Sequence, residues 1–392
     1  MQKKIPHINP SITFNKLSDN EFILCNTLHK HYLKINKDTY DLLSLIDNER
    51  SLQEICELHN QQSEKELTVN ALHFLLYDKL SKYGLLVGEE EQIKPYQKPS
   101  YLKLSFIIFS KRFIAKITPS LHFLFRKKIA FPLLILCAVM IGTELYLLLD
   151  GYKSFKVQES VIFFLVVMAI SVTFHELGHA TAASHFGAEH GGIGGGFYLF
   201  TPVYFADVTD VWRLKKWQRV VVNCAGMYFE IIFCTLLSLV GLLLEQISLT
   251  LIAIIVCLHT FFNLNPFLRS DGYWILSDIT NKPNLLQHSF RKIGDVFKMI
   301  KGKKVQWTKI DFLLLVYGLI SYSFIVLFVY YVLFKNPHSI LNFPQNLYHF
   351  LKSLCNKDAT ISLVSFGELI VPMLFFYLLF SFLKSILRKK KI

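Results

Sequence analysis

The sequence predicts a mainly α-helical, polytopic membrane protein of about six transmembrane helices, preceded by a small soluble α+β domain. Of the 392 residues, 52% are hydrophobic and the mean hydropathy is +0.37, whereas ordinary soluble domains carry about 45–50% apolar residues. The distribution of these residues is the stronger observation. The first hundred residues are mixed in polarity, and the rest alternates long apolar runs with short basic stretches. This order is typical of a soluble domain followed by a membrane domain.

Three regions follow from this distribution: residues 1–100 as a cytosolic domain, 101–128 as a basic juxtamembrane segment, and 129–392 as a membrane domain with its core at 160–280. Within the last region, six apolar stretches reach the roughly 20 residues that a crossing helix needs. They are 129–149, 160–181, 219–244, 249–267, 311–334 and 361–384.

Lysine and arginine gather on one side of these stretches. With the N-terminus inside, the cytoplasmic flanks hold 25 Lys and Arg and the external loops hold 5. Cytoplasmic loops carry such an excess, so we expect a multi-pass protein of the cell membrane with both termini in the cytoplasm. The polar start, Met1 to Pro10, has no signal-peptide core and agrees with this orientation.

The net charge of +13 comes mainly from the basic stretches beside the apolar runs, because only 12 of the 42 Lys and Arg lie in residues 1–102. Charge beside apolar runs indicates a lipid bilayer as the partner and not a nucleic acid. The seven cysteines are scattered without a CxxC pair, so neither a disulfide framework nor a thiolate metal site is expected.

The second apolar stretch ends in a polar motif, His175-Glu176-Leu177-Gly178-His179. Charged side chains in a spanning helix cost about 2.5–3.5 kcal/mol each, so something must offset that cost. A spacing of four places His175 and His179 on one helical face, which provides half of a tetrahedral zinc site. Glu176 lies beside that face, where it can hold the attacking water. The motif therefore predicts a Zn²⁺ site with Glu176 as the catalytic base.

A third zinc ligand has two candidates. His185 follows the motif at the spacing of the metzincins, but Ala182 stands where that pattern needs a helix-breaking glycine. Asp271 follows the fourth apolar stretch on the same side as the histidine pair, after Pro266 and before Gly272. Proline stops a helix and glycine permits a tight turn, which favours Asp271, although it also suits an ordinary helix N-cap.

These motifs resemble the site-2 protease family of intramembrane zinc metalloproteases, and within it the branch of peptide zinc metalloproteases. The likeness covers residues 160–280: the HELGH motif, a glycine-rich stretch from Gly191 to Gly196, and Asn265-Pro266 followed by Asp271-Gly272. It implies a zinc-dependent endopeptidase with His175, His179 and Asp271 as ligands and Glu176 as general base. Two positions depart from the family. Ser270 replaces the leucine of Leu-Asp-Gly, and Met227 replaces the proline of Ala-Gly-Pro, with Glu230 further along.

Two further features admit alternatives. Asn263 and Asn265 either steady the substrate or oxyanion, or bind backbone carbonyls freed by Pro266. The stretch 193–208 has strand-like composition. It forms either a re-entrant hairpin whose edge receives an extended substrate, or a lipid-facing loop with aromatic anchors.

The first hundred residues contain short strand patterns at 22–24 and 32–35, a helical pattern from 39 to 47, a capping box at Ser51–Glu54 and a third helix at about 66–83. This order is similar to the small winged-helix precursor-peptide recognition element, as in the peptide chaperone of pyrroloquinoline quinone synthesis. The resemblance implies capture of a leader peptide as an added strand. A winged helix without a ligand is the alternative.

Taken with these resemblances, the sequence predicts an intramembrane zinc endopeptidase that matures a ribosomally made precursor peptide. A second hypothesis is a regulatory protease acting on a membrane-bound anti-sigma factor or a signal-peptide remnant. A third is a non-catalytic immunity or export protein of the same fold, which the intact ligand and base positions disfavour.

Overall fold

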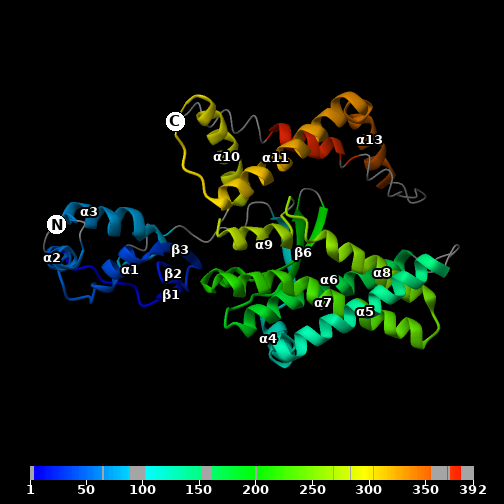
Figure 1. Ribbon diagram of the computed structural model, residues 1–392, viewed down its shortest axis with the longest axis horizontal. Helices are drawn as coiled ribbons and strands as arrows, with labels where there is room; N and C mark the ends of the chain where they lie inside the picture. The colour runs from blue at the N-terminus through cyan, green and yellow to red at the C-terminus, as the bar shows by residue number, and fades with distance from the viewer. Residues whose placement is uncertain are drawn as a thin grey trace. The chain divides into compact units, whose positions relative to one another are not determined.

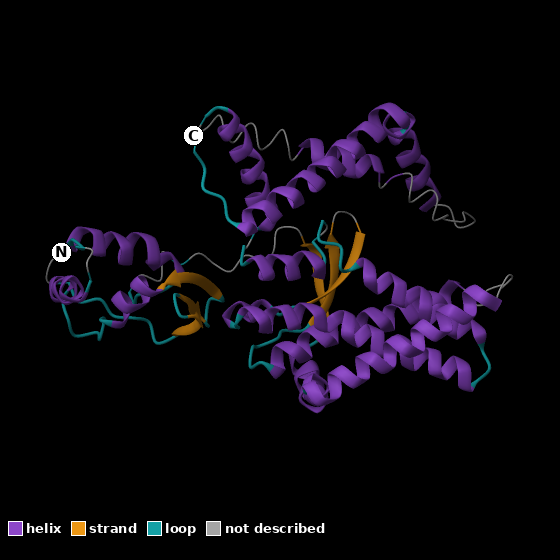
Figure 2. Cartoon of the chain, in the orientation of Figure 1, coloured by secondary structure: helices purple, strands orange, loops and turns teal. Residues whose placement is uncertain are grey.

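The computed structural model describes residues 4–63, 66–88, 93, 102–151, 161–198, 201–267, 269–282, 284–302, 304–354, 369 and 371–380. These residues are mostly helical, with two three-stranded sheets (Figure 2). The chain divides into two compact units. One comprises residues 1–197 and 202–281, and the other 198–201 and 282–392.

The N-terminal domain is an antiparallel sheet followed by helices (Figure 1). Its strands pair in the order β1-β2-β3, and the predicted strands and helices appear near their expected places. The strand β1 lies outside the sequence-predicted elements. The elements are β1 (Ile12–Ser18), β2 (Glu21–Asn26), β3 (His31–Asn36), α1 (Lys37–Ser44), α2 (Leu52–Gln62) and α3 (Val69–His73), which continues as a π-helical turn, 74–80.

Side-chain caps and a leucine-rich core hold this domain together. Asn36 caps α1 by accepting from the N–H of Thr39, and the capping box of Ser51 and Glu54 opens α2 as predicted. Fully buried side chains from the sheet and all three helices meet in one core. Each contributes about 1.5–3 kcal/mol through burial. They include Leu24, Leu43, Leu52, Ile55, Leu72 and Leu76.

Four helices among the described residues are long and apolar enough to cross a membrane: Lys127–Tyr146, Phe163–His185, Lys216–Leu243 and Lys309–Lys335. They belong to α5 (Lys127–Gly151), α6 (Val161–His185), α7 (Lys216–Leu243) and α11 (Lys309–Tyr330) with its continuation.

Of the other two predicted spans, 249–267 corresponds to the shorter helix α8 (Ile247–Phe262). The span 361–384 lies outside the described residues except for residue 369 and the apolar helix Val371–Phe380. A helix of 16 residues is about 24 Å long, less than the roughly 30 Å hydrocarbon core. The described residues therefore support a membrane protein with four candidate spans, and the six-span count stays a prediction.

The helices α5 to α8 form a bundle around α7 (Figure 1). The close contact of α6 and α7 depends on Gly178, where a Cβ would overlap the carbonyl of Ala225. Further along the bundle, Val167 of α6, Cys234 of α7 and Val256 of α8 are buried in one apolar cluster. The close contact of Gly178 with the α7 backbone thus brings the polar residues of α6 against α7.

A second sheet lies beside this bundle, with strand order β4-β5-β6. The hairpin β5 (Ile193–Tyr198) and β6 (Thr201–Ala206) occupies the stretch with strand-like composition. Its partner β4 (Leu102–Phe109), followed by α4 (Lys111–Leu121), falls in the segment predicted only as basic and juxtamembrane. Ile193, Ala180 of α6 and Ile114 of α4 share a buried cluster.

Glycines permit this sheet to form. A Cβ on Gly192 or Gly194 would overlap the carbonyl oxygen of Phe109 or Phe106 in β4. The glycine-rich stretch therefore allows close approach of the hairpin to β4, which any larger residue would prevent.

The remaining described helices follow α8. They are α9 (Asp271–Thr280), α10 (Leu285–Ile300), α12 (His338–Leu341) and α13 (Phe343–Leu354). Within the second unit α10 packs against α11. At this contact Gly318 of α11 lies against the backbone of Ser289 of α10, and Leu285 and Leu314 of the two helices are buried.

Candidate metal centre

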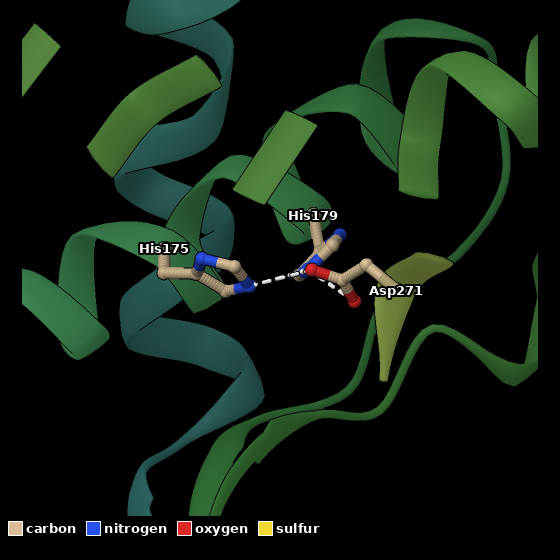
Figure 3. Close-up of side chains that lie close together, drawn as sticks. All are labelled: His175, His179 and Asp271. Carbon is tan, nitrogen blue, oxygen red and sulfur yellow. Dashed lines mark hydrogen bonds and ion pairs between the residues drawn. The ribbon is translucent and has the colours of Figure 1, made fainter. Parts of the chain in front are cut away.

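Three potential ligands from two helices converge in the bundle (Figure 3). His175 and His179 lie on α6, and Asp271 is the first residue of α9. The two Nε2 atoms are 3.1 Å apart, Oδ2 of Asp271 is 2.9 Å from Nε2 of His175, and Oδ1 is 3.4 Å from Nε2 of His179. Tetrahedral zinc, with bonds of about 2.0–2.1 Å, places its ligand atoms about 3.3 Å from one another. The three side chains therefore have the spacing that one ion requires.

Two observations show that a metal ion fits these residues. Oδ2 of Asp271 is buried and, despite its proximity to His175, accepts no aligned hydrogen bond from the described residues. Gly226 of α7 faces the pair of imidazoles, and a Cβ there would overlap both Nε2 atoms. The three potential ligand atoms thus surround a space large enough for an ion. A side chain at Gly226 would fill this space.

The ionisation of Asp271 suits a ligand. Burial favours the neutral carboxyl, but the nearby His179 and His175 outweigh it, so the pKa of Asp271 lies well below its usual range. Asp271 and Glu230 each place a carboxylate oxygen 2.9 Å from a ring nitrogen of His175, which favours a bound cation.

Each histidine is oriented through its other ring nitrogen. Nδ1 of His175 lies 2.9 Å from Oε2 of Glu230, and Nδ1 of His179 lies 2.7 Å from the carbonyl oxygen of Val222. A proton on Nδ1 donates to these acceptors and leaves Nε2 free for a metal. Both acceptors belong to α7, so α7 fixes the direction of both ligands.

Sequence reasoning noted Glu230 without giving it a role. The side chain is 1% exposed, and its Oε1 accepts a hydrogen bond of 2.9 Å from the hydroxyl of Ser171. An ionisable residue in an apolar helix is the signal that could have indicated its role. Its partner His175 is 55 residues away, which no local pattern reveals.

Asp271 is placed by a turn and an ion pair. The N–H of Gly272 donates to the carbonyl of Asn263 at 2.7 Å, which folds the chain back after α8. Further along α9, Asp278 accepts from Nε of Arg219 at 2.6 Å and from Asn223 at 2.9 Å. These buried contacts fasten α9 to the beginning of α7.

Asn263 and Asn265 lie in this turn and outside the group of three ligands. Oδ1 of Asn265 accepts from the N–H of Phe267 at 2.9 Å, and its carbonyl accepts from the hydroxyl of Ser270 at 2.7 Å. Asn263 contributes the backbone carbonyl to Gly272. These hydrogen bonds shape the Asp271 turn, and both alternatives for the side chains of Asn263 and Asn265 stay predictions.

Glu176 and His185 lie outside the group of three potential ligands. Glu176 is buried next to the histidines, and the backbone N–H of Ala206, the last residue of β6, donates to its carboxylate. His185 ends α6, and its ring stacks on Phe125 with ring centroids 5.5 Å apart. The carboxylate of Glu176 therefore lies beside the edge strand β6, and His185 makes an aromatic contact.

Comparison with known proteins adds one likeness. The Bacillus subtilis (strain 168) protein named "Putative peptide zinc metalloprotease protein YydH" is 26% identical over 207 residues, which cover 50% of this chain and 79% of that protein. No family model matches the chain, and no solved structure matches it. At this low identity the likeness supports a zinc metalloprotease role and zinc as the metal.

Substitution of Glu230 by glutamine should weaken zinc binding about 10- to 100-fold, because the acceptor that orients His175 loses its charge. Asp271→Ala removes a ligand and should abolish stoichiometric zinc. Zinc content of the purified protein, measured against a competing chelator, tests both. Ser238→Ala, a change at a buried α7 hydroxyl outside the ligand group, is the control and should keep full zinc. Full occupancy in Asp271→Ala would return His185 to consideration as the third ligand.

Proposed function

We propose that the chain is an intramembrane zinc endopeptidase of the site-2 protease type that matures a ribosomally made precursor peptide. The observation that carries this proposal is the convergence of His175, His179 and Asp271, with Glu176 beside them on a candidate membrane span. A zinc ion at this site supplies the Lewis acidity that makes water nucleophilic near neutral pH and polarises a peptide carbonyl.

Glu176 performs the proton transfers in this proposal. Its carboxylate accepts a proton from the attacking water and passes it to the nitrogen of the leaving amine. Burial on α6 and the hydrogen bond from Ala206 hold the carboxylate in place. Gly226 has no side chain that would overlap the two Nε2 atoms, so both histidines stay free to hold the metal.

The strand β6 is suited to hold the substrate. It lies at one edge of the sheet β4-β5-β6, and its last residue contacts Glu176. A peptide that pairs with a sheet edge is extended, so its scissile bond is exposed to attack. We infer that substrate adds to this edge and that its backbone passes the base.

The N-terminal domain, in the same proposal, is a winged-helix element that recognises the leader of the precursor. Its strand β3 is an edge strand. Nearby, Nζ of Lys30 lies 3.3 Å from Asp207, and the hydroxyl of Tyr32 donates to Asp210 at 2.8 Å. Asp207 directly follows β6. These contacts support delivery of a bound leader's downstream region toward β6.

Substitution of Glu176 tests the proposed chemistry directly. Glu176→Gln should retain zinc, because all three ligands remain, and should lose at least about 100-fold in cleavage rate, because the base is lost. Zinc content and proteolysis are measured on the same detergent-purified sample. Substantial cleavage by Glu176→Gln would refute the mechanism.

Removal of residues 1–100 tests leader recognition. A tether raises the local concentration of substrate without changing the chemical step. The truncation should therefore lose at least tenfold in turnover of the full precursor at low concentration, while a short peptide spanning the cut is affected much less. Equal losses for both substrates, or normal processing of the full precursor by a folded truncation, would contradict the recognition role.

A multi-pass protein with both termini in the cytoplasm is the topology that we propose, from the charge bias of the flanks. Single cysteines at the exposed positions Gln345 and Lys304 test it in intact cells, after replacement of the native cysteines. An impermeant thiol reagent should label position 345 and not position 304. The reverse pattern would turn the catalytic side outward.

A further inference from the structure

A cavity of about 460 Å³ lies in the second unit, between α10 and the beginning of α11. Its lining includes four cations, Lys282, Arg291, Lys292 and Lys298, and two carboxylates, Asp295 and Asp311. The lining therefore carries two more positive charges than negative ones. None of these residues belongs to the candidate metal centre.

The two carboxylates are already paired within the cavity wall. Lys292 lies 2.9 Å from Asp311 and 3.6 Å from Asp295, and Lys298 lies 2.8 Å from Asp295. Arg291 is exposed and forms no ion pair with any described residue. Its guanidinium presents a planar set of donors that suits a phosphate oxygen pair.

The pKa of His288, another residue of the cavity wall, responds to the same positive charges. Burial, followed by the charges of Lys282, Arg291 and Lys292, lowers the pKa of this imidazole. A neutral ring at physiological pH adds a hydrogen-bonding group without adding charge. The cavity therefore combines excess positive charge with a neutral donor, which favours an anion as its occupant.

The depth of the cavity indicates where that anion comes from. Asp311 and Leu314 of its wall lie in the first turns of α11, and the candidate span begins at Lys309. The cavity is thus at the level where a membrane's headgroups meet its hydrocarbon. On α10, Phe297 and Ile300 are three residues apart, 62% and 75% exposed, as in a helix that lies in a membrane interface.

We propose that this cavity binds the phosphate-bearing headgroup of an anionic phospholipid from the leaflet that faces residues 282–308. The headgroup phosphate contacts Arg291 and the neighbouring lysines, and the acyl chains lie along the apolar faces of α10 and α11. Basic pockets beside membrane helices on the cytoplasmic side are suited to such lipids. A volume of about 460 Å³ is in the range of small-ligand sites.

Thermal unfolding of the full-length, detergent-purified protein tests this site with defined lipids. Dioleoylphosphatidylglycerol should raise the unfolding midpoint in a saturable way, and dioleoylphosphatidylcholine should raise it much less. In Arg291→Gln/Lys298→Gln, the lipid concentration for half the effect should rise about thirtyfold, because each replacement removes a direct charge-assisted hydrogen bond to the headgroup phosphate, a loss of about fivefold. Both side chains are exposed, so their replacement leaves the packed core intact.

The matched control is Lys301→Gln/Lys304→Gln, which removes the same charge from exposed positions outside the cavity. It should change the half-effect concentration less than about threefold, because charges outside the cavity act on the headgroup only through solvent, where salt screens them. An equal loss in both double variants would show diffuse attraction and no pocket. An equal response to phosphatidylcholine would show that charge is unnecessary, and an equal shift with inorganic phosphate alone would show a soluble-anion site. Because the readout is unfolding, the result is independent of the proposed proteolysis.

Discussion

The burial of ionisable groups in an apolar bundle is the constraint on which the rest of the structure depends. Such groups are costly unless each has a partner, and α7 supplies the partners: Glu230 for His175, the Val222 carbonyl for His179, and open backbone at Gly226. Close contact of α6 with α7 is therefore a requirement of the polar cluster. The packing at Gly178 provides that contact.

The parts of the site that the sequence predicted are those with a local signal. The four-residue spacing of the histidines determines their common face, and a proline followed by Asp271-Gly272 marks a turn after an apolar helix. The strand-like composition of 193–208 suits a hairpin or a lipid-facing loop, and the structure has the strands β5 and β6 there. In the N-terminal domain the capping box of Ser51 and Glu54 marked the start of a helix, as the structure shows.

The parts that the sequence did not reveal depend on contacts between distant segments. The strand β4 pairs with a hairpin more than eighty residues later in the chain, and its apolar alternation is hidden in a basic flank. The pairing of Glu230 with His175 spans 55 residues. The predicted span 249–267 and the helix α8 differ in where they end. The helix α8 ends at Phe262, whereas the apolar composition continues past Asn265-Pro266.

The two histidines differ in the hydrogen-bond acceptor at Nδ1. Nδ1 of His175 is hydrogen-bonded to the carboxylate of Glu230, whereas Nδ1 of His179 is hydrogen-bonded to the neutral carbonyl of Val222. An anionic acceptor increases the electron density of the ring more than a neutral one does. The centre is therefore electronically asymmetric, with a strong donor toward the middle of α6 and a weaker donor one turn further along. A metal ion bound by both rings would be held more strongly by His175 than by His179.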